Sequence, residues 1–148
     1  MVYLIVVLAH RLRYKFDKYY LHVNGSYSRI SIYNDKNSRC ELHMPTSESS
    51  FNKGLVMLLD CLHQFTVHLE PYSNLLGRSV MVTVIEGDKI NQSSIKYSSE
   101  SMEQWTRACK CMLYQLQQLC LVSQFKDKED QKTQHTNDPV LASLATMK

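Results

Sequence analysis

Apolar side chains recur three and four residues apart along one long segment near the C-terminal end of the chain, from Ser99 to Phe125. This spacing places them on one face of an amphipathic helix. A helix of that length is roughly 40 Å long, which exceeds the length of an ordinary strand. We therefore expect part of its apolar face to extend beyond the sheet and to form a protein interface. The predicted interface residues are Met112, Leu116, Leu119 and Val122.

A second amphipathic helix is predicted from Thr46 to Phe65. Thr46 can cap its first turn, and apolar residues follow at spacings of four and three. Gly54 within this helix costs about 1 kcal/mol relative to alanine, so packing has to compensate. Beyond the helix, the pattern predicts a short strand around Val67 and Leu69 and a loop over 71–77. The apolar stripe consists of Phe51, Leu55, Leu58, Leu62 and Phe65.

Most of the remaining segments alternate apolar and polar residues or are rich in valine and isoleucine, which is typical of strands. The N-terminal run Val2–Ala9 is apolar at every position, and this composition predicts a buried strand. Asn24-Gly25 and Gly87-Asp88 indicate turns between strands. The segments expected to be strands are 2–9, 10–16, 18–23, 29–33, 39–44, 80–86 and 94–97.

The elements therefore follow the order strands, helix, strands, helix, which predicts an α+β fold in which two amphipathic helices pack on an antiparallel sheet. The length of 148 residues suits one domain, which we place at residues 1–125. A charged tail follows at 126–148. The tail ends in a short amphipathic segment that begins at Asp138 and carries Leu141 and Leu144, and we expect these two leucines to dock on a partner.

Positive charge is concentrated near the N-terminus. The chain has 17 Lys and Arg against 14 Asp and Glu, a net charge of +3. Four cations opposed only by Asp17 lie between residues 11 and 18, so the excess is local. On a strand they would alternate with aromatic rings, an arrangement that suits a single strand of DNA or RNA. The residues of this alternative interface are Arg11, Arg13, Lys15, Lys18, Tyr14 and Tyr20.

The succession of Lys18–Val23 and Ser28–Ile32 is loosely similar to the single-stranded-nucleic-acid-binding repeats of the PUR and whirly kind. That resemblance implies the same alternative function, binding of single-stranded nucleic acid along residues 11–20. The competing interpretation is a sheet whose exposed face carries ordinary solvated Arg and Lys side chains.

The five cysteines are an odd number and lie mainly at apolar positions, as reduced core residues do in an intracellular protein. We therefore expect a cytoplasmic or nuclear location. The N-terminal apolar run is far shorter than the ~20 residues that span a bilayer, so no membrane association is expected.

The sequence contains neither a nucleophile elbow nor a glycine-rich phosphate loop, and we expect no cofactor and no metal. Val23–Ser26 resembles in outline the first strand end of ribonuclease-H-like nucleases, which implies a degenerate nuclease as a further alternative. In that family an aspartate stands where this chain has Asn24, and an uncharged side chain binds magnesium poorly. Glu41 and Glu86 would be the other ligands. The favoured prediction is a non-enzymatic assembly or adaptor subunit that binds another protein or a second copy of itself.

Overall fold

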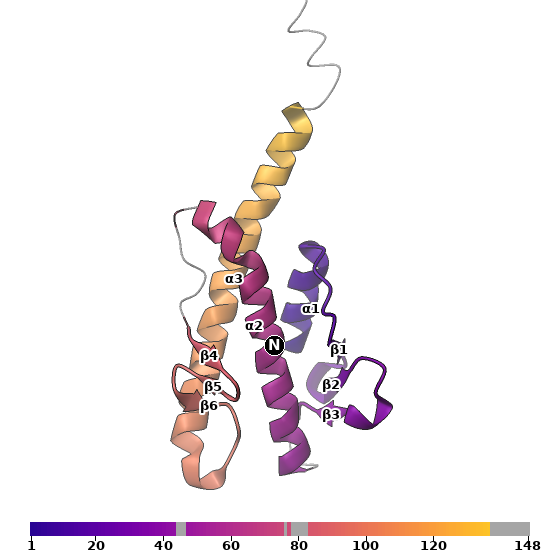
Figure 1. Ribbon diagram of the computed structural model, residues 1–148, viewed down its shortest axis with the longest axis vertical. Coiled ribbons are helices and arrows are strands. Elements are labelled where there is room, and N and C mark those ends of the chain that lie inside the picture. Colours follow the sequence, from indigo (N-terminus) through magenta and orange to yellow (C-terminus); the bar gives the residue numbers. More distant parts are fainter. Residues whose placement is uncertain (44–46, 76, 78–82, 137–148) are drawn as a thin grey trace, which may run out of the picture.

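The computed structural model describes residues 1–43, 47–75, 77 and 83–136. Three α-helices dominate this part of the chain: α1 (Val2–Arg11), α2 (Glu48–Leu75) and α3 (Met102–Thr136). Helices α2 and α3 pack side by side along the long axis, and α1 packs beside them (Figure 1).

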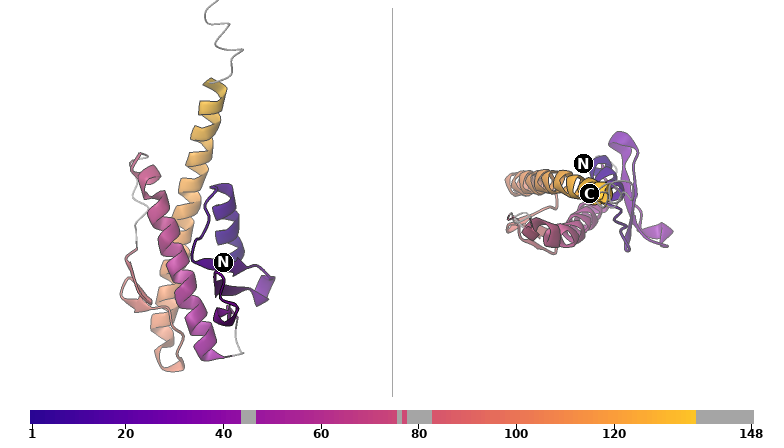
Figure 2. Two further views of the ribbon diagram at one scale, coloured as in Figure 1. Left: turned by 45° about the vertical axis from the view of Figure 1, so that its right-hand side comes forward. Right: turned by 90° about the horizontal axis from the view of Figure 1, so that it is seen from above.

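Within the described residues, the strands form two small antiparallel sheets. The first contains β1 (Tyr19–His22), β2 (Arg29–Ile32) and β3 (Cys40–Glu41), and the second contains β4 (Ile85–Glu86), β5 (Lys89–Ile90) and β6 (Ser93–Ser94). The first sheet packs against α2 and the second against α3, so each sheet rests on the helix that follows it in the chain. Figure 2 shows the first sheet on one side of the helices. The α+β class and the succession of strands, helix, strands, helix are confirmed, with two sheets in place of one.

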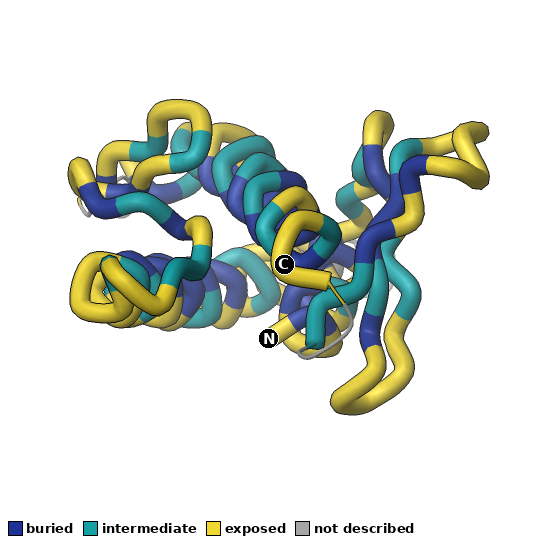
Figure 3. The backbone as a smooth tube through the Cα atoms, turned by 90° about the horizontal axis from the view of Figure 1, so that it is seen from below, coloured by how far each residue is buried: buried dark blue, intermediate teal, exposed yellow. Residues whose placement is uncertain are grey.

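The core lies between the two long helices and the inner faces of the sheets. Figure 3 shows buried residues on the inner sides of these elements and exposed residues in the peripheral turns and on the outer sides of the helices. Leu62, Phe65 and Leu69 of α2 are fully buried, as is Ile30 of β2. The structure gives a reason for glycine at position 54 of α2. A Cβ at Gly54 would lie only 3.2 Å from the Cβ of Cys40 in β3. Glycine thus permits the close approach of sheet and helix.

The N-terminal prediction was wrong, because residues 2–9 form a helix and not a strand. Ile5, Leu8 and Leu12 follow one another at helical spacing and are buried in the common core. The surrounding positions are also apolar, which hides the helical period in the sequence. Burial against the other helices, and not local propensity, favours the helix here.

The predicted basic strand at 10–16 is also absent. Helix α1 ends in a Schellman motif, in which the Tyr14 N–H donates to the Ala9 carbonyl at 2.8 Å and the Arg13 N–H to the His10 carbonyl at 3.1 Å. Arg13 occupies the left-handed region with a φ of 53°. Arg11 therefore lies on a helix, Arg13 in its cap and Lys15 beyond it.

Helix α2 is longer than predicted and includes both the expected strand around Leu69 and Pro71 of the expected loop. Leu69 and Ser73 are fully buried and continue the buried face of the helix, so tertiary packing carries the helix through the proline. Of the expected strand at 80–86, Ile85–Glu86 forms β4, and 80–82 lie outside the described residues.

The predicted exposed patch on the last helix was wrong as well. Met112, Leu116, Leu119 and Val122 retain at most 6% of their exposure and belong to the chain's own core. The reason is cover from two other helices, since both α2 and α1 pack against α3. Helix α3 extends beyond that cover with polar residues 128–133, part of the expected tail. Leu141 and Leu144 lie outside the described residues.

Candidate protein-interaction surface

Helix α1 is apolar on two opposite sides. Ile5 and Leu8 face the core, whereas Tyr3, Leu4 and Val7 point outward and are 68%, 39% and 39% exposed. The first turn contains no acidic residue. A helix that is apolar all round is normally covered on all sides, so these three side chains form a surface suited to a partner. We call Tyr3, Leu4 and Val7 the α1 surface.

A groove of about 500 Å³ begins beside the α1 surface and runs between α1, the segment that follows it and the first sheet. Helix α1 contributes one wall, and exposed tyrosines on the sheet side contribute another. Tyr20 and Tyr33 are each about half exposed there, at 53% and 50%. We call this the aromatic groove, and the lining residues used below are Val6, His10, Tyr14, Lys15, Tyr20 and Tyr33.

The floor of the aromatic groove is held by ring contacts with α2. The Tyr14 ring lies 5.3 Å from that of Phe65 and 4.5 Å from that of His68, and the Phe16 ring packs edge-on against Tyr14 at 5.0 Å. Burial is the main reason that the pKa of the Tyr14 phenol is raised, with a smaller contribution from the charge of Asp17. The phenol therefore stays neutral at physiological pH.

The sheet wall of the groove is fixed by Asp60 of α2. The Tyr19 hydroxyl donates to Asp60 Oδ2 at 2.6 Å, and the Gln64 amide donates to the same oxygen at 3.3 Å. The Lys18 ammonium lies 3.6 Å from it. Burial, followed by the hydrogen bond to Asp60, raises the pKa of the Tyr19 phenol. These contacts tie the start of β1 to α2 and set the width of the groove.

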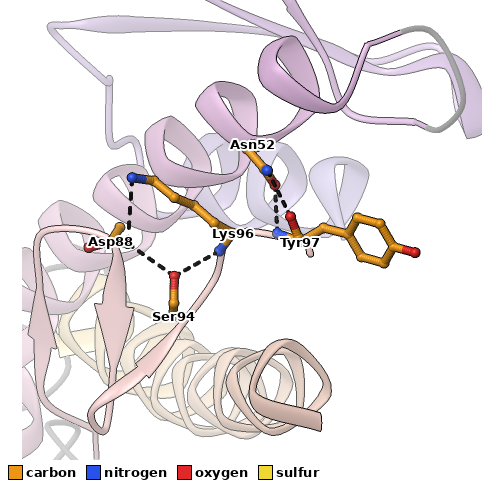
Figure 4. A network of polar contacts seen from close by, with 5 residues as sticks. All are labelled: Asn52, Asp88, Ser94, Lys96 and Tyr97. Atoms are coloured by element: carbon orange, nitrogen blue, oxygen red, sulfur yellow. Dashed lines mark hydrogen bonds and ion pairs between the residues drawn. The ribbon is translucent and has the colours of Figure 1, made fainter. Parts of the chain in front are cut away.

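The second sheet is tied to α2 in a similar way (Figure 4). The Asn52 side chain donates to the Tyr97 carbonyl at 2.9 Å and accepts from the Tyr97 N–H at 2.6 Å, as a neighbouring strand would. Ser94 donates to Asp88 at 3.0 Å, and Lys96 lies 3.6 Å from the same carboxylate. Burial acts to raise the pKa of Asp88, but the Ser94 hydrogen bond and the Lys96 charge lower it overall. This network positions the chain for α3 and lies apart from the aromatic groove.

The cations predicted to bind nucleic acid do not form an array. Arg11 pairs with Asp127 of α3, and Lys18 pairs with Asp60. Lys15 lines the aromatic groove with Tyr14 and Tyr20. The structure thus removes the alternating strand on which the nucleic-acid prediction relied, and it places two of the predicted residues in ion pairs.

The nuclease arrangement does not form either. Asn24 precedes a short 3₁₀ helix, Gly25–Tyr27, and Glu41 and Glu86 lie in different sheets. Across the described parts of the chain, His, Cys, Asp and Glu side chains do not gather in threes at metal-binding distance. In the same residues, none of the helices combines the length and the apolar character needed to cross a bilayer.

Sequence reasoning missed Tyr3, Leu4, Val7, His10 and Tyr33 as surface residues. The available signal was the apolar character of α1 at nearly every position together with the basic residues of its last turn, which favour a helix C-terminus. If Val2–Ala9 is interpreted as a helix, its apolar residues fall on two sides. The core of the domain covers one side and leaves the other exposed.

The α1 surface and the aromatic groove lie in a part of the chain that matches a known protein family. The Apg6 BARA domain family matches residues 1–124. A Beclin-1-like protein of Drosophila melanogaster is 29% identical over 130 residues, which covers 78% of this chain and 29% of that protein. Beclin-1 of Xenopus tropicalis is 29% identical over 127 residues, with 78% and 28% covered. The chain thus spans less than a third of the length of these relatives, and it belongs to the Apg6 BARA domain family.

Proposed function

We propose that this chain is a non-enzymatic scaffold or adaptor module of an intracellular autophagy assembly and that it binds a protein partner through the α1 surface. Family membership supports the scaffold role. The observation that carries the binding site is the outward apolar side of α1, with Tyr3, Leu4 and Val7 exposed on a helix whose other side is already in the core.

The size of the α1 surface suits a small set of anchors. Full burial of a leucine or valine side chain contributes about 1.5–3 kcal/mol, and an aromatic ring on the same patch adds more area. A few such residues at the centre of an interface commonly supply most of its binding free energy. Tyr3, Leu4 and Val7 lie on adjacent turns of one rigid helix, so binding does not require them to be ordered first.

The last helix, α3, has a structural role in this proposal. Met112, Leu116 and Leu119 stabilise the chain by packing in its core, which leaves the partner-binding role to α1. The sequence pattern around Leu141 and Leu144 supports a second docking element, and deletion of residues 138–148 tests it separately.

Proximity labelling in cells, with the full chain as bait, tests the α1 surface. Leu4→Glu places a carboxylate at the centre of the surface, and the matched control Val67→Glu changes an apolar residue of α2 that is similarly exposed at 45%. We expect autophagy proteins labelled by the wild-type chain to be lost with Leu4→Glu and retained with Val67→Glu. Circular dichroism melts of both variants check that folding is intact.

Identical labelling by the two variants would contradict the proposal. Light scattering adds the identity of the occupant, because a dimer that Leu4→Glu converts to a monomer makes the partner a second copy of this chain. A monomer that still loses its cellular partners on Leu4→Glu makes the partner a different protein.

A further inference from the structure

We infer that the aromatic groove is the binding site for an acidic amphipathic helix of a protein partner. In this complex, aliphatic side chains would enter between Tyr14, Tyr20 and Tyr33, and a carboxylate would face Lys15. The inference rests on the proposed role in protein association and adds the chemistry of the partner.

The charge of the groove is one-sided. Among the described residues, the lining contains one charged side chain, Lys15, and no Asp or Glu. The charge of Asp17 acts on Tyr14, but Asp17 is not part of the lining. Of the neighbouring cations, Arg11 and Lys18 are already paired with Asp127 and Asp60. In the described residues, no ion pair engages Lys15 or His10. A partner carboxylate can therefore pair with the Lys15 ammonium, and this favours an acidic partner.

The two sides of the groove suit the side-chain rows of a helix. Val6 and His10 from α1 line one side, and Tyr20 and Tyr33 line the other. In the described residues β1 is the edge strand of the first sheet, so an extended peptide is the competing occupant. A helix satisfies its own backbone and presents rows of side chains at spacings of three and four, which suits the facing side chains of α1 and the two tyrosines. The apolar row of such a helix fits between the two walls.

The groove is also prepared for binding before a partner arrives. Tyr14 is held by Phe65 and His68 of α2, and Tyr19 is held by Asp60. The remaining freedom lies mainly in Tyr20 and Tyr33, whose half-exposed rings gain burial on binding. Aromatic anchors of this kind lose little conformational entropy, because each has two side-chain torsions.

Fluorescence anisotropy with labelled synthetic peptides tests this inference. The probe is an amphipathic helix with leucine on one face and glutamate on the other, and the matched peptides carry glutamine or lysine in place of glutamate. We expect the acidic peptide to bind at least tenfold more tightly than the lysine peptide and to weaken as salt is raised. The proton–nitrogen NMR signals of Lys15, Tyr20 and Tyr33 should shift on binding.

Charge reversal supplies the sharpest comparison. Lys15→Glu should weaken the acidic peptide about tenfold or more and strengthen the lysine peptide, whereas Lys53→Glu, an exposed lysine on α2, should change neither. Tyr33→Ala should weaken all three peptides. Equal affinity for the acidic and lysine peptides, shifts confined to another face, or no binding by any peptide at millimolar concentration would each overturn the inference.

The two proposals fail in different ways. If Leu4→Glu removes the cellular partners and Lys15→Glu leaves both partners and peptides unaffected, the α1 surface stands and the acidic-helix groove falls. If Lys15→Glu weakens the acidic peptide and Leu4→Glu leaves the cellular partners in place, the groove stands and the α1 surface falls.

Discussion

Replacement of Arg13 by glycine should stabilise the protein, because Arg13 caps α1 in a backbone conformation that glycine adopts more easily. Its φ of 53° lies in the left-handed region, and the Arg13 and Tyr14 N–H groups close the helix end by donating to His10 and Ala9. This position of the Schellman motif is the one that glycine usually occupies.

The expected gain follows from two opposing terms. A residue with a Cβ in the left-handed region costs about 1–2 kcal/mol. Glycine loses more backbone entropy on folding, by about 0.5–1 kcal/mol. Arg13→Gly should therefore raise the free energy of unfolding by about 0.5–1 kcal/mol, and for a chain of this size raise Tm by roughly 1–4 °C.

Urea unfolding followed by circular dichroism measures this change, and Arg13→Ala is the matched control. Alanine removes the guanidinium but keeps the Cβ, so it should bring no comparable gain. A stabilisation by alanine equal to that by glycine would show that the charge and not the backbone is responsible. A loss of stability with glycine would refute the strain argument itself.

Three further predictions concern the core and its titrating groups. Gln115→Leu should lower the free energy of unfolding by about 1–3 kcal/mol in urea melts, because the buried Gln115 oxygen accepts from the Thr83 hydroxyl at 2.8 Å and leucine leaves that hydroxyl unpaired. Burial and then the Lys126 charge lower the pKa of His68, so the unfolded chain binds the proton first and stability should fall as pH drops below about 6.5; His68→Gln should flatten this part of the stability profile. Burial and the nearby Asp60 raise the pKa of the Cys61 thiol to about 12, so mass spectrometry should find Cys61 alkylated by iodoacetamide only after unfolding.

The local pattern of apolar and polar residues predicted each element correctly where one face is buried and the other is exposed to solvent. Phe51, Leu58 and Phe65 keep helical spacing along α2, and they pack in the core as predicted. The alternation of Arg29–Ile32 predicted the central strand of the first sheet, and Gly87, at a φ of 60°, the turn between β4 and β5. In such segments the period of the side chains and the period of the backbone agree, so sequence alone determines the element.

The interaction surface required tertiary information. Val2–Ala9 is apolar throughout, so its sequence shows no period, and only packing against α2 and α3 makes it a helix with one side left exposed. The aromatic groove joins Val6, Tyr14 and Tyr33, which are brought together by the cap at Arg13 and by the pairing of β1 with β2.

The exposure of the apolar residues of α3 likewise depends on segments that are distant in sequence. The spacing of apolar residues in α3 predicted its apolar face correctly, but whether Leu116 and Leu119 are covered depends on the common core that they share with α1 and α2. Amphipathic character is a property of a local stretch of sequence. The choice of which apolar face is covered and which remains free is a property of the packed chain, because burial is shared between segments that are distant in sequence.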